Sequence, residues 1–256
     1  MESIVFEPFH DLYLKIIATD IDTQVIAEID LKILILLFSI IILMKIKLYL
    51  VRHGLSCCNV LHHQKFKYIS PLNVFHKDPY LTLKGQEQSK KAGEYIKGRI
   101  ADPDIVFTSS LIRAIETGLC MFPGKHVQIA PYLCERRPNA ENLPYSFESQ
   151  KKRLKLKVKN YNKVIKCNQD EGLSSSDFNK FIDYLIQNYD NIENKTIVIV
   201  THSLLLMKTL NLKERMNNNA IIEIMIDTNT YTIEEYRQVF TGYIFPKHVD
   251  IRMSMR

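Results

Sequence analysis

The sequence is poor in tryptophan and glycine, and its basic residues outnumber its acidic residues only slightly. Its 256 residues contain no tryptophan and only eight glycines, which we attribute to a compositional bias of the source. The five cysteines are odd in number and form no C-x-x-C pair, which argues against a zinc site or a disulfide framework. Reduced thiols in the cytoplasm are the expectation. The net charge of +6 suits an anionic substrate but falls short of the dense basic stripe of nucleic-acid-binding proteins, so no nucleic-acid partner is predicted.

An apolar run near the N-terminus is shorter than a membrane-spanning helix. It covers residues 33–43, is continued by Met44 and stops at Lys45, whereas a spanning helix needs about 20 apolar residues. The residues directly before the run include acidic ones, which is unlike the basic start of a signal peptide. A membrane-spanning or secretory role for this run is therefore not favoured.

Two regions are predicted from this boundary. Residues 1–43 are expected to be an N-terminal extension, and residues 44–256 a catalytic domain. Three interpretations of the extension stay open: a region upstream of a true start at Met44, an anchor to a membrane or partner through residues 31–44, and an additional packed element.

From residue 44 onward, short apolar runs alternate with segments of helical period, a pattern typical of strands and helices. Expected strands cover residues 45–51, 105–108, 127–130, 197–200, 220–226 and 231–236, and expected helices cover 82–98, 109–122, 176–189 and 203–210. Thr82, and either Ser109 or Ser110, are expected to cap the first two helices. The alternation predicts an α/β fold, a three-layer αβα sandwich with a mostly parallel central sheet, in which the wholly apolar run 197–200 lies at the centre.

Chemically capable side chains follow the predicted strands at their carboxyl ends, where ligands bind in such folds. They are Arg52 with His53, the stretch from Ser109 to Arg113, Glu135, and His202. The planar guanidinium of an arginine fits a phosphate group, and a neutral imidazole is a competent nucleophile toward phosphorus. The combination therefore predicts phosphoryl-transfer chemistry.

Four separate motifs are present, and together they contain all of these residues except Glu135. They are Arg52-His53-Gly54 with Ser56 and Asn59, then Asp78-Pro79-Tyr80-Leu81-Thr82-Leu83-Lys84-Gly85-Gln86-Glu87-Gln88, then Ser109-Ser110-Leu111-Ile112-Arg113-Ala114-Ile115-Glu116-Thr117, and finally Val200-Thr201-His202-Ser203. In this order they resemble the motifs of the histidine phosphatase superfamily, also called the phosphoglycerate mutase-like family. The resemblance covers residues 44 to about 240 and implies a phosphoglycerate mutase-like fold.

The resemblance also implies roles for individual residues. His53 would be the nucleophile that is phosphorylated, and His202 would complete the catalytic set by binding the transferred phosphoryl group. Arg52 and Arg113 would bind that group too, and Asn59 would contact phosphate or substrate near the mouth of the site. Glu135 would protonate the leaving group, with Glu141 as a second candidate for this role. No metal and no cofactor are implied.

The predicted function is a phosphomonoester hydrolase that acts through a phosphohistidine on His53. Its substrate would be a small phosphomonoester or a phosphoprotein. The first alternative is a phosphoglycerate mutase-type phosphotransferase, but Glu135 is followed by Arg136-Arg137-Pro138 where the mutases continue with His-Tyr-Gly. The second alternative is a non-catalytic module that binds a phosphorylated ligand. The sequence does not predict the oligomeric state.

One further segment is strongly basic. From Lys151 to Lys159, cationic and apolar residues alternate over much of its length. We interpret it as a solvated edge or the face of an insertion, and the alternative is attraction of a polyanionic substrate or of membrane headgroups.

Overall fold

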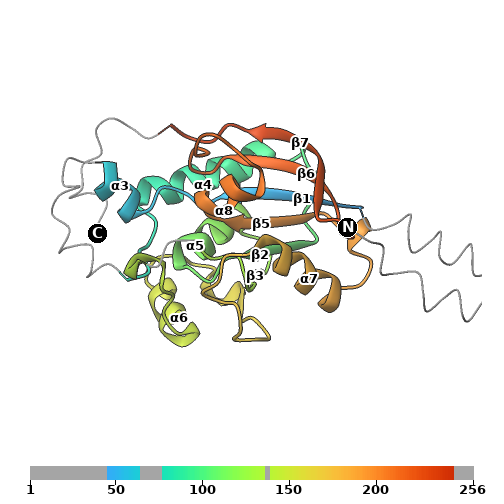
Figure 1. Ribbon diagram of the computed structural model, residues 1–256. Coiled ribbons are helices and arrows are strands. Elements are labelled where there is room, and N and C mark those ends of the chain that lie inside the picture. The colour runs from blue at the N-terminus through green and yellow to red at the C-terminus, as the bar shows by residue number, and fades with distance from the viewer. Residues whose placement is uncertain (1–44, 64–76, 136–138, 245–256) are drawn as a thin grey trace, which may run out of the picture. The chain divides into compact units, whose positions relative to one another are not determined.

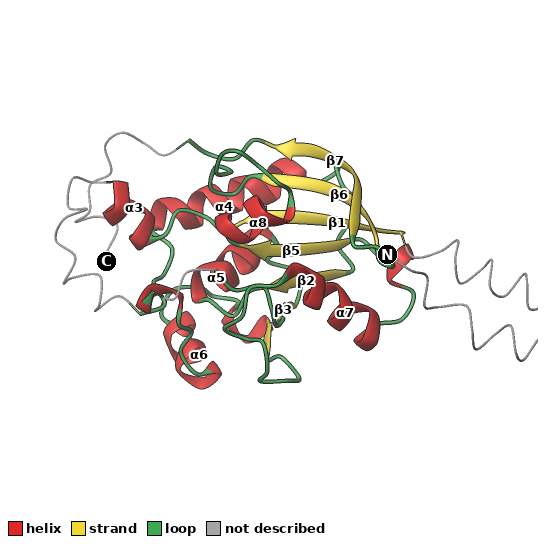
Figure 2. Cartoon of the chain, viewed as in Figure 1, coloured by secondary structure: helices red, strands yellow, loops and turns green. Residues whose placement is uncertain are grey.

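The structure, a computed structural model, describes residues 45–63, 77–135 and 139–244 (Figure 1). Its strands are β1 (Lys45–Arg52), β2 (Ile105–Thr108), β3 (Val127–Ile129), β4 (Val164–Ile165), β5 (Ile197–Thr201), β6 (Ile221–Asp227) and β7 (Thr232–Phe240). Its α-helices are α3 (Cys57–His63), α4 (Leu83–Ile96), α5 (Ile112–Met121), α6 (Phe147–Lys155), α7 (Phe178–Asn188) and α8 (Ser203–Thr209) (Figure 2). Short 3-10 helices cover residues 140–142, 161–163 and 192–194.

The strands form one seven-stranded sheet in the order β4-β3-β2-β5-β1-β6-β7. The first five strands of this order are mutually parallel, and β6 and β7 continue the sheet in antiparallel pairing. The predicted α/β fold with a mostly parallel sheet is confirmed. So is the central position of β5, whose five residues are all buried.

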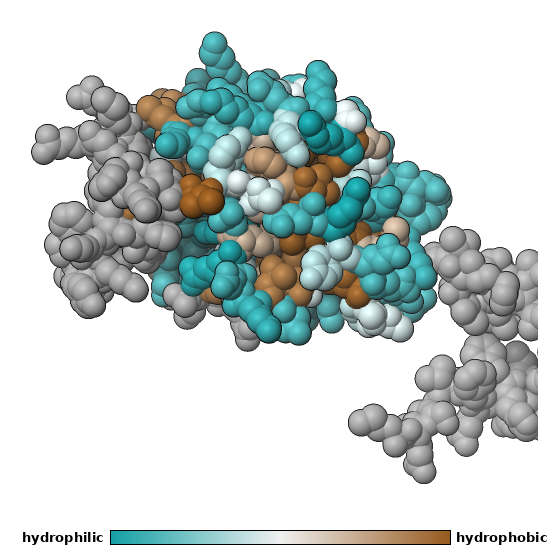
Figure 3. Space-filling model, turned by 90° about the horizontal axis from the view of Figure 1, so that it is seen from above, coloured by the Kyte–Doolittle hydropathy of each residue, from teal (hydrophilic) through white to brown (hydrophobic). Residues whose placement is uncertain are grey.

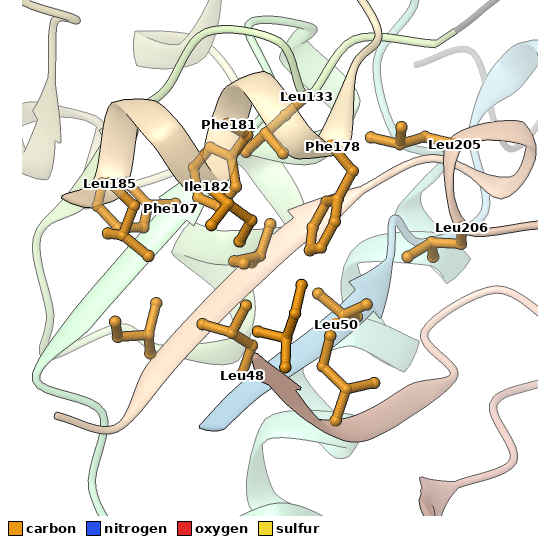
Figure 4. Close-up of a cluster of buried hydrophobic side chains, with 14 of the residues drawn as sticks. Leu48, Leu50, Phe107, Leu133, Phe178, Phe181, Ile182, Leu185, Leu205 and Leu206 are labelled. Atoms are coloured by element: carbon orange, nitrogen blue, oxygen red, sulfur yellow. The ribbon is translucent and has the colours of Figure 1, made fainter. Parts of the chain in front are cut away.

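Helices cover both faces of the sheet, which gives the three predicted layers (Figure 2). On one face, α7 and α8 pack on the strands, and the side chains of α7 that meet them include Phe181 and Leu185 (Figure 4). On the other face, α4 and α5 contribute residues such as Ile96 and Ile115 to a second cluster, to which Leu154 of α6 belongs. Burial of each such large apolar side chain contributes roughly 1.5–3 kcal/mol, so the two clusters hold the layers together.

The first residues of two helices test the capping predictions. The hydroxyl of Thr82 accepts a hydrogen bond from the N–H of Gly85 at 2.9 Å, so the predicted cap of α4 is confirmed. The prediction that Ser109 or Ser110 caps α5 is wrong, because the cap residue is Leu111 and it offers no side-chain bond.

A carboxylate distant in sequence accepts a hydrogen bond from the first residue of α5 instead. The N–H of Ile112 donates to Asp78 Oδ1 at 2.8 Å. Ser109 Oγ accepts a hydrogen bond from the N–H of Leu111 at 3.2 Å and lies 2.8 Å from His202 Nε2. Ser110 Oγ donates to the carbonyl of Leu173.

On the face shown in Figure 3, hydrophilic residues surround the hydrophobic ones that are visible near its middle. Among the helices of the described ranges, none combines the length and the apolar character needed to cross a bilayer. The predictions for residues 1–43, including the apolar run 33–43 and the anchor through 31–44, fall outside the described residues and stay predictions.

Candidate active site

Adjacent strand ends bring the two motif histidines together. In the register of the sheet, Arg52 of β1 is the partner of Thr201 of β5, so the residues that follow, His53 and His202, leave the sheet side by side. The N–H of His53 donates to the carbonyl of Thr201 at 2.9 Å. The two imidazole rings are 5.1 Å apart between centroids, at an interplanar angle of 54°. The carboxyl ends of the two strands therefore form one histidine pair.

His53 is buried in a state suited to nucleophilic attack. Its Nδ1 lies 2.7 Å from the carbonyl oxygen of Gly54, and because a carbonyl can only accept, Nδ1 carries the proton and Nε2 keeps its lone pair. Burial, and then the positive charges of Arg113 and Arg52, hold the pKa of His53 well below its usual range. The imidazole is therefore neutral at pH 7.

His202 is buried beside His53 and has unused hydrogen-bonding capacity. Its Nε2 lies 2.8 Å from the hydroxyl oxygen of Ser109, at the end of β2. Its Nδ1 is buried and makes no hydrogen bond to the described residues. Burial, Arg113 and the neighbouring His53 lower its pKa well below the usual range, so both rings are uncharged at neutral pH.

The two arginines are held by different parts of the chain. Arg113, in the first turn of α5, is buried, and its Nη1 and Nη2 donate to the carbonyl of Glu141 at 2.8 Å and to Asn142 Oδ1 at 2.7 Å. Arg52 donates through Nη1 to the carbonyl of Met216. Burial lowers the pKa of Arg52 to about 10, so it stays a cation at neutral pH.

The two candidate acids occupy different surroundings. Glu135 is half-buried, accepts a hydrogen bond from the N–H of Leu204 at 3.2 Å through Oε1, and is the acidic group that supports the charge of Arg52. The carboxyl of Glu141 instead interacts with the thiol of Cys58, whose pKa it raises together with burial. Glu135 therefore acts electrostatically on one predicted phosphate-binding arginine, Arg52, whereas the backbone carbonyl of Glu141 accepts a hydrogen bond from the other, Arg113.

Asn59 is oriented by a residue that the sequence analysis missed. Asn59 Oδ1 accepts hydrogen bonds from the backbone N–H of Ser56 at 3.1 Å and from Asn218 Nδ2 at 3.2 Å. The same Nδ2 of Asn218 donates to the carbonyl of His53 at 2.9 Å. Asn218 thus ties the nucleophile's backbone to Asn59, and no motif at its position signals this role.

A hydroxyl of α5 fixes the loop that carries His53. Thr117 Oγ1 accepts from the N–H of Gly54 at 2.9 Å and donates to the carbonyl of Arg113 at 2.7 Å. A Cβ at Gly54 would lie 2.6 Å from the hydroxyl of Ser89, so only glycine fits there without displacement. Thr117 was part of the third motif, but the sequence alone gave it no role.

Two buried carboxylates join the second and third motif segments to each other and to neighbouring parts of the chain. Asp78 accepts from Ile112 N, from Gln150 Nε2 at 2.7 Å and from Tyr145 N at 3.2 Å. Glu116 of α5 accepts from Leu81 N at 2.6 Å and from the side chain of Gln86 at 3.0 Å. Burial raises the pKa of Glu116 to about 7 and also raises that of Asp78.

Several polar atoms near the histidines are buried without a hydrogen-bond partner in the described part of the chain. They are Arg52 Nε, His202 Nδ1 and Ser203 Oγ. Such atoms cost free energy unless a ligand or water satisfies them. The described residues contain no group of three or more His, Cys, Asp or Glu side chains arranged to hold a metal ion, and the prediction that no metal is needed stays a prediction.

A pocket of about 350 Å³ opens beside this centre. It is lined by Ser110 and by residues around the start of α6, Tyr145 and Gln150 among them, but by neither histidine and neither arginine. It is therefore distinct from the space between the two rings.

Comparison with known sequences decides the family. The sequence profile of the histidine phosphatase superfamily (branch 1) matches residues 48–239. The chain belongs to this superfamily. The match contains all four motifs, with both histidines and both arginines, and also Glu135, so the predicted family is confirmed over nearly the whole predicted range of residues 44 to about 240.

Similar individual proteins include both phosphatases and mutases. Phosphoglycerate mutase 1 of Saccharomyces cerevisiae is 40% identical over 73 residues, which is 28% of this chain and only a quarter of the length of that protein. The ecdysone phosphate phosphatase of Bombix mori superposes with a TM-score of 0.52 at 13% identity, over 81% of this chain and 98% of that one. A phosphoserine phosphatase of Entamoeba histolytica has 22% identity and a TM-score of 0.45, with 75% and 97% of the chains covered. The second likeness supports the phosphoglycerate mutase-like fold.

Proposed function

We propose that this protein is a phosphomonoester hydrolase that forms a phosphohistidine on His53. The observation that carries the proposal is the state of His53: buried, neutral, protonated on Nδ1 and placed beside two cationic arginines. A histidine in this state presents the Nε2 lone pair to an electrophile, and the arginines favour an electrophile that carries negative charge.

The reaction follows from these groups. His53 Nε2 attacks phosphorus while the bond between phosphorus and the ester oxygen breaks. Arg52, Arg113 and His202 meet the charge on the phosphoryl oxygens. Arg52 Nε and His202 Nδ1 have no hydrogen-bond partner among the described residues. Glu135 gives its proton to the departing oxygen, then takes a proton from water, and that water displaces the phosphoryl group from His53 as inorganic phosphate.

The proposal is tested by trapping the intermediate. The full chain is mixed with para-nitrophenyl phosphate, quenched rapidly at neutral or alkaline pH because phosphohistidine is labile in acid, and analysed by peptide mass spectrometry. A phosphate adduct on the peptide that contains His53, together with steady release of para-nitrophenol, is the expected result. Steady release with the adduct on another residue, or with no adduct in the wild type or in a Glu135→Gln variant that slows breakdown, contradicts the proposal.

A phosphoglycerate mutase-type phosphotransferase is the second candidate, favoured by the local 40% identity to the yeast phosphoglycerate mutase. Both reactions share the phosphohistidine, and they differ in what accepts the phosphoryl group. Interconversion of 3-phosphoglycerate and 2-phosphoglycerate in the presence of a bisphosphate primer, faster than release of inorganic phosphate, identifies a mutase. Release of phosphate that exceeds interconversion identifies the hydrolase.

A further inference from the structure

The positive charge of the chain is concentrated in one segment. The sequence contains 34 Lys and Arg against 28 Asp and Glu. Residues 149–169 contain eight of those cations and no acidic residue, so the other 235 residues carry 26 cations against 28 acidic residues. The net charge of +6 therefore arises from this segment alone. The cations are Lys151, Lys152, Arg153, Lys155, Lys157, Lys159, Lys163 and Lys166.

The first part of this segment is α6 with the turn after it, and its outer side is cationic. Leu154 and Val158 point inward and are 1% and 8% exposed, whereas Lys152, Lys155 and Lys159 are exposed. Among the ion pairs of the described residues, none includes a cation between 151 and 159. No ion pair of the described residues therefore neutralises the outer lysines Lys152, Lys155 and Lys159.

Aromatic rings hold the inner cations without cancelling their charge. The guanidinium carbon of Arg153 lies 4.3 Å from the ring centroid of Tyr80 and 4.5 Å from that of Tyr145. The ammonium of Lys157 lies 5.4 Å from the Tyr80 ring. A ring face attracts a cation through its quadrupole and contributes no opposite net charge. These contacts hold Arg153 and Lys157 on the inner side of the segment, where both also act on the buried carboxyl of Glu116, so the net positive charge of the outer side comes from Lys152, Lys155 and Lys159.

A single apolar side chain projects from the same surface. Leu156 follows the last residue of α6, between Lys155 and Lys157, and is 81% exposed. Leu83 and Leu143, the other exposed leucines in the described ranges, reach only 52% and 48%. The surface thus combines several ammonium groups with one leucine that the fold does not bury.

The chemistry of this surface fits one kind of partner. Lysines carry compact, strongly hydrated charges that suit a diffuse array of anions, whereas directed contacts to a single phosphate favour arginine. The boundary of an anionic bilayer offers phosphate and carboxylate groups to the lysines and acyl chains to the leucine. An acidic peptide or a nucleic acid would meet the lysines but offer the leucine less. We propose that Lys152, Lys155, Leu156 and Lys159 form a docking surface for anionic lipid bilayers.

Docking through this surface would bring the catalytic end of the sheet near the bilayer. Gln150 in α6 donates through Nε2 to the carbonyl of Ser110 at 2.6 Å, and Ser110 precedes the helix that carries Arg113. In Figure 1, α6 lies toward the same side as α3, which follows the carboxyl end of β1. The docking proposal requires no turnover and stands whether the enzyme is a hydrolase or a mutase.

Co-sedimentation of the full chain with vesicles tests the proposal. Vesicles of phosphatidylcholine alone are compared with vesicles that contain about 30% phosphatidylserine. Wild-type protein is expected to bind only the anionic vesicles and to dissociate as salt is raised. A variant with Lys152→Gln, Lys155→Gln and Lys159→Gln should partition roughly 100-fold more weakly.

A matched variant separates this surface from charge in general. Lys84→Gln, Lys90→Gln and Lys97→Gln remove the same charge from exposed positions in and next to α4 and should leave binding within about twofold of wild type. Leu156→Asn should weaken binding by roughly 3-fold to 10-fold, with little change in its salt dependence.

Four outcomes overturn the proposal. The first two are that wild-type protein does not bind the anionic vesicles and that both triple variants lose binding equally. The third is that the α6 variant still binds, which places the binding elsewhere in the chain, and the fourth is that a poly-glutamate peptide binds α6 more tightly than the vesicles do. The single charge reversal Lys155→Glu, which removes an exposed side chain and leaves Leu154 in place, repeats the test if the triple variant is poorly folded.

Discussion

The histidine pair and the carboxylate cluster behind it are both buried, yet their polar atoms are satisfied to different degrees. Around His53 and His202, Arg52 Nε, His202 Nδ1 and Ser203 Oγ are among the buried polar atoms that lack a partner in the described residues. Around Asp78 and Glu116, each of the four carboxylate oxygens accepts at least one N–H bond. The first region retains capacity for a ligand, and the second has used its capacity to join segments of the chain.

The histidine pair and the carboxylate cluster also differ in what burial does to their pKa values. Burial lowers the pKa of both histidines and raises the pKa of both carboxyl groups. In each case the neutral form is favoured, because a charge loses its hydration on burial. The consequence for function differs, since a neutral histidine is a nucleophile whereas a carboxyl group near its pKa makes stability depend on pH.

The largest effect is expected on turnover from the histidine pair. His53→Ala removes the nucleophile and should lower kcat for para-nitrophenyl phosphate by about 10⁴-fold or more. The exposed His126→Ala is the control and should keep wild-type turnover. Circular dichroism establishes that both variants are folded, and a His53→Ala protein with more than a tenth of wild-type kcat refutes the assigned nucleophile.

The next largest effect is expected on stability from the carboxylate cluster. Asp78→Ala leaves Ile112 N, Tyr145 N and Gln150 Nε2 without their acceptor, which should lower the free energy of unfolding by about 4 kcal/mol. Urea denaturation measures the loss. Asp170→Ala removes an exposed carboxylate and should change stability by less than about 0.5 kcal/mol. Equal effects of the two substitutions would show that the hydrogen bonds of buried Asp78 stabilise the fold no more than an exposed carboxylate does.

A pH-dependent effect is expected at Glu116. Because its folded pKa of about 7 exceeds the ordinary 4.5, its stabilisation is complete below pH 4.5 and is lost as pH rises through 7. Wild type should lose about 2 kcal/mol relative to Glu116→Gln between pH 5.5 and pH 8. Denaturation curves of wild type and variant at both pH values give the change with pH in their difference in unfolding free energy. The exposed Glu148→Gln is the control. A change near zero for Glu116→Gln means that Glu116 is ionised throughout.

The smallest effect is expected on turnover from Thr117, which lies next to Glu116 in α5 and bonds to the loop that carries His53. Thr117→Val keeps the shape of the side chain but removes the acceptor for Gly54 N and the donor to Arg113 O, so kcat should fall by about tenfold. KM for a small phosphomonoester should change less than kcat. Steady-state kinetics beside Thr232→Val, an exposed threonine of β7, measures this, and an unchanged kcat would show that Gly54 needs no support from α5.

The sequence predicted those elements whose periodicity matches their burial. β5 is apolar throughout and buried throughout, and α7 has apolar residues on the face that it buries. α6 was not predicted, because only Gln150 and Leu154 among its nine residues are buried and the lysines mask any apolar period. α3 was not predicted either, since it has only seven residues and the first three of them lie within the first motif. The start of α5 was misassigned because its capping group, Asp78, lies 34 residues earlier in the chain.

The candidate site was predicted where a residue type alone suggests chemistry. His53 and His202 directly follow β1 and β5, Arg52 ends β1, and Arg113 lies in the first turn of α5. The roles predicted for these residues and for Glu135 stay predictions. Ser109 was assigned to a helix cap, and only the structure shows it beside His202. Asn218 had no signal at all, because an asparagine in a loop gives no indication of the backbone group that it binds.

The position of β5 in the sheet has a consequence for the newly synthesised chain. β5 lies between β1 and β2, although it is made about 90 residues after β2. Until residues 197–201 leave the ribosome, β1 and β2 have no strand between them to pair with, so this pairing is completed late and over a long sequence separation. The strand that completes the sheet is followed directly by His202, so a chain truncated before it lacks both the centre of the sheet and half of the histidine pair.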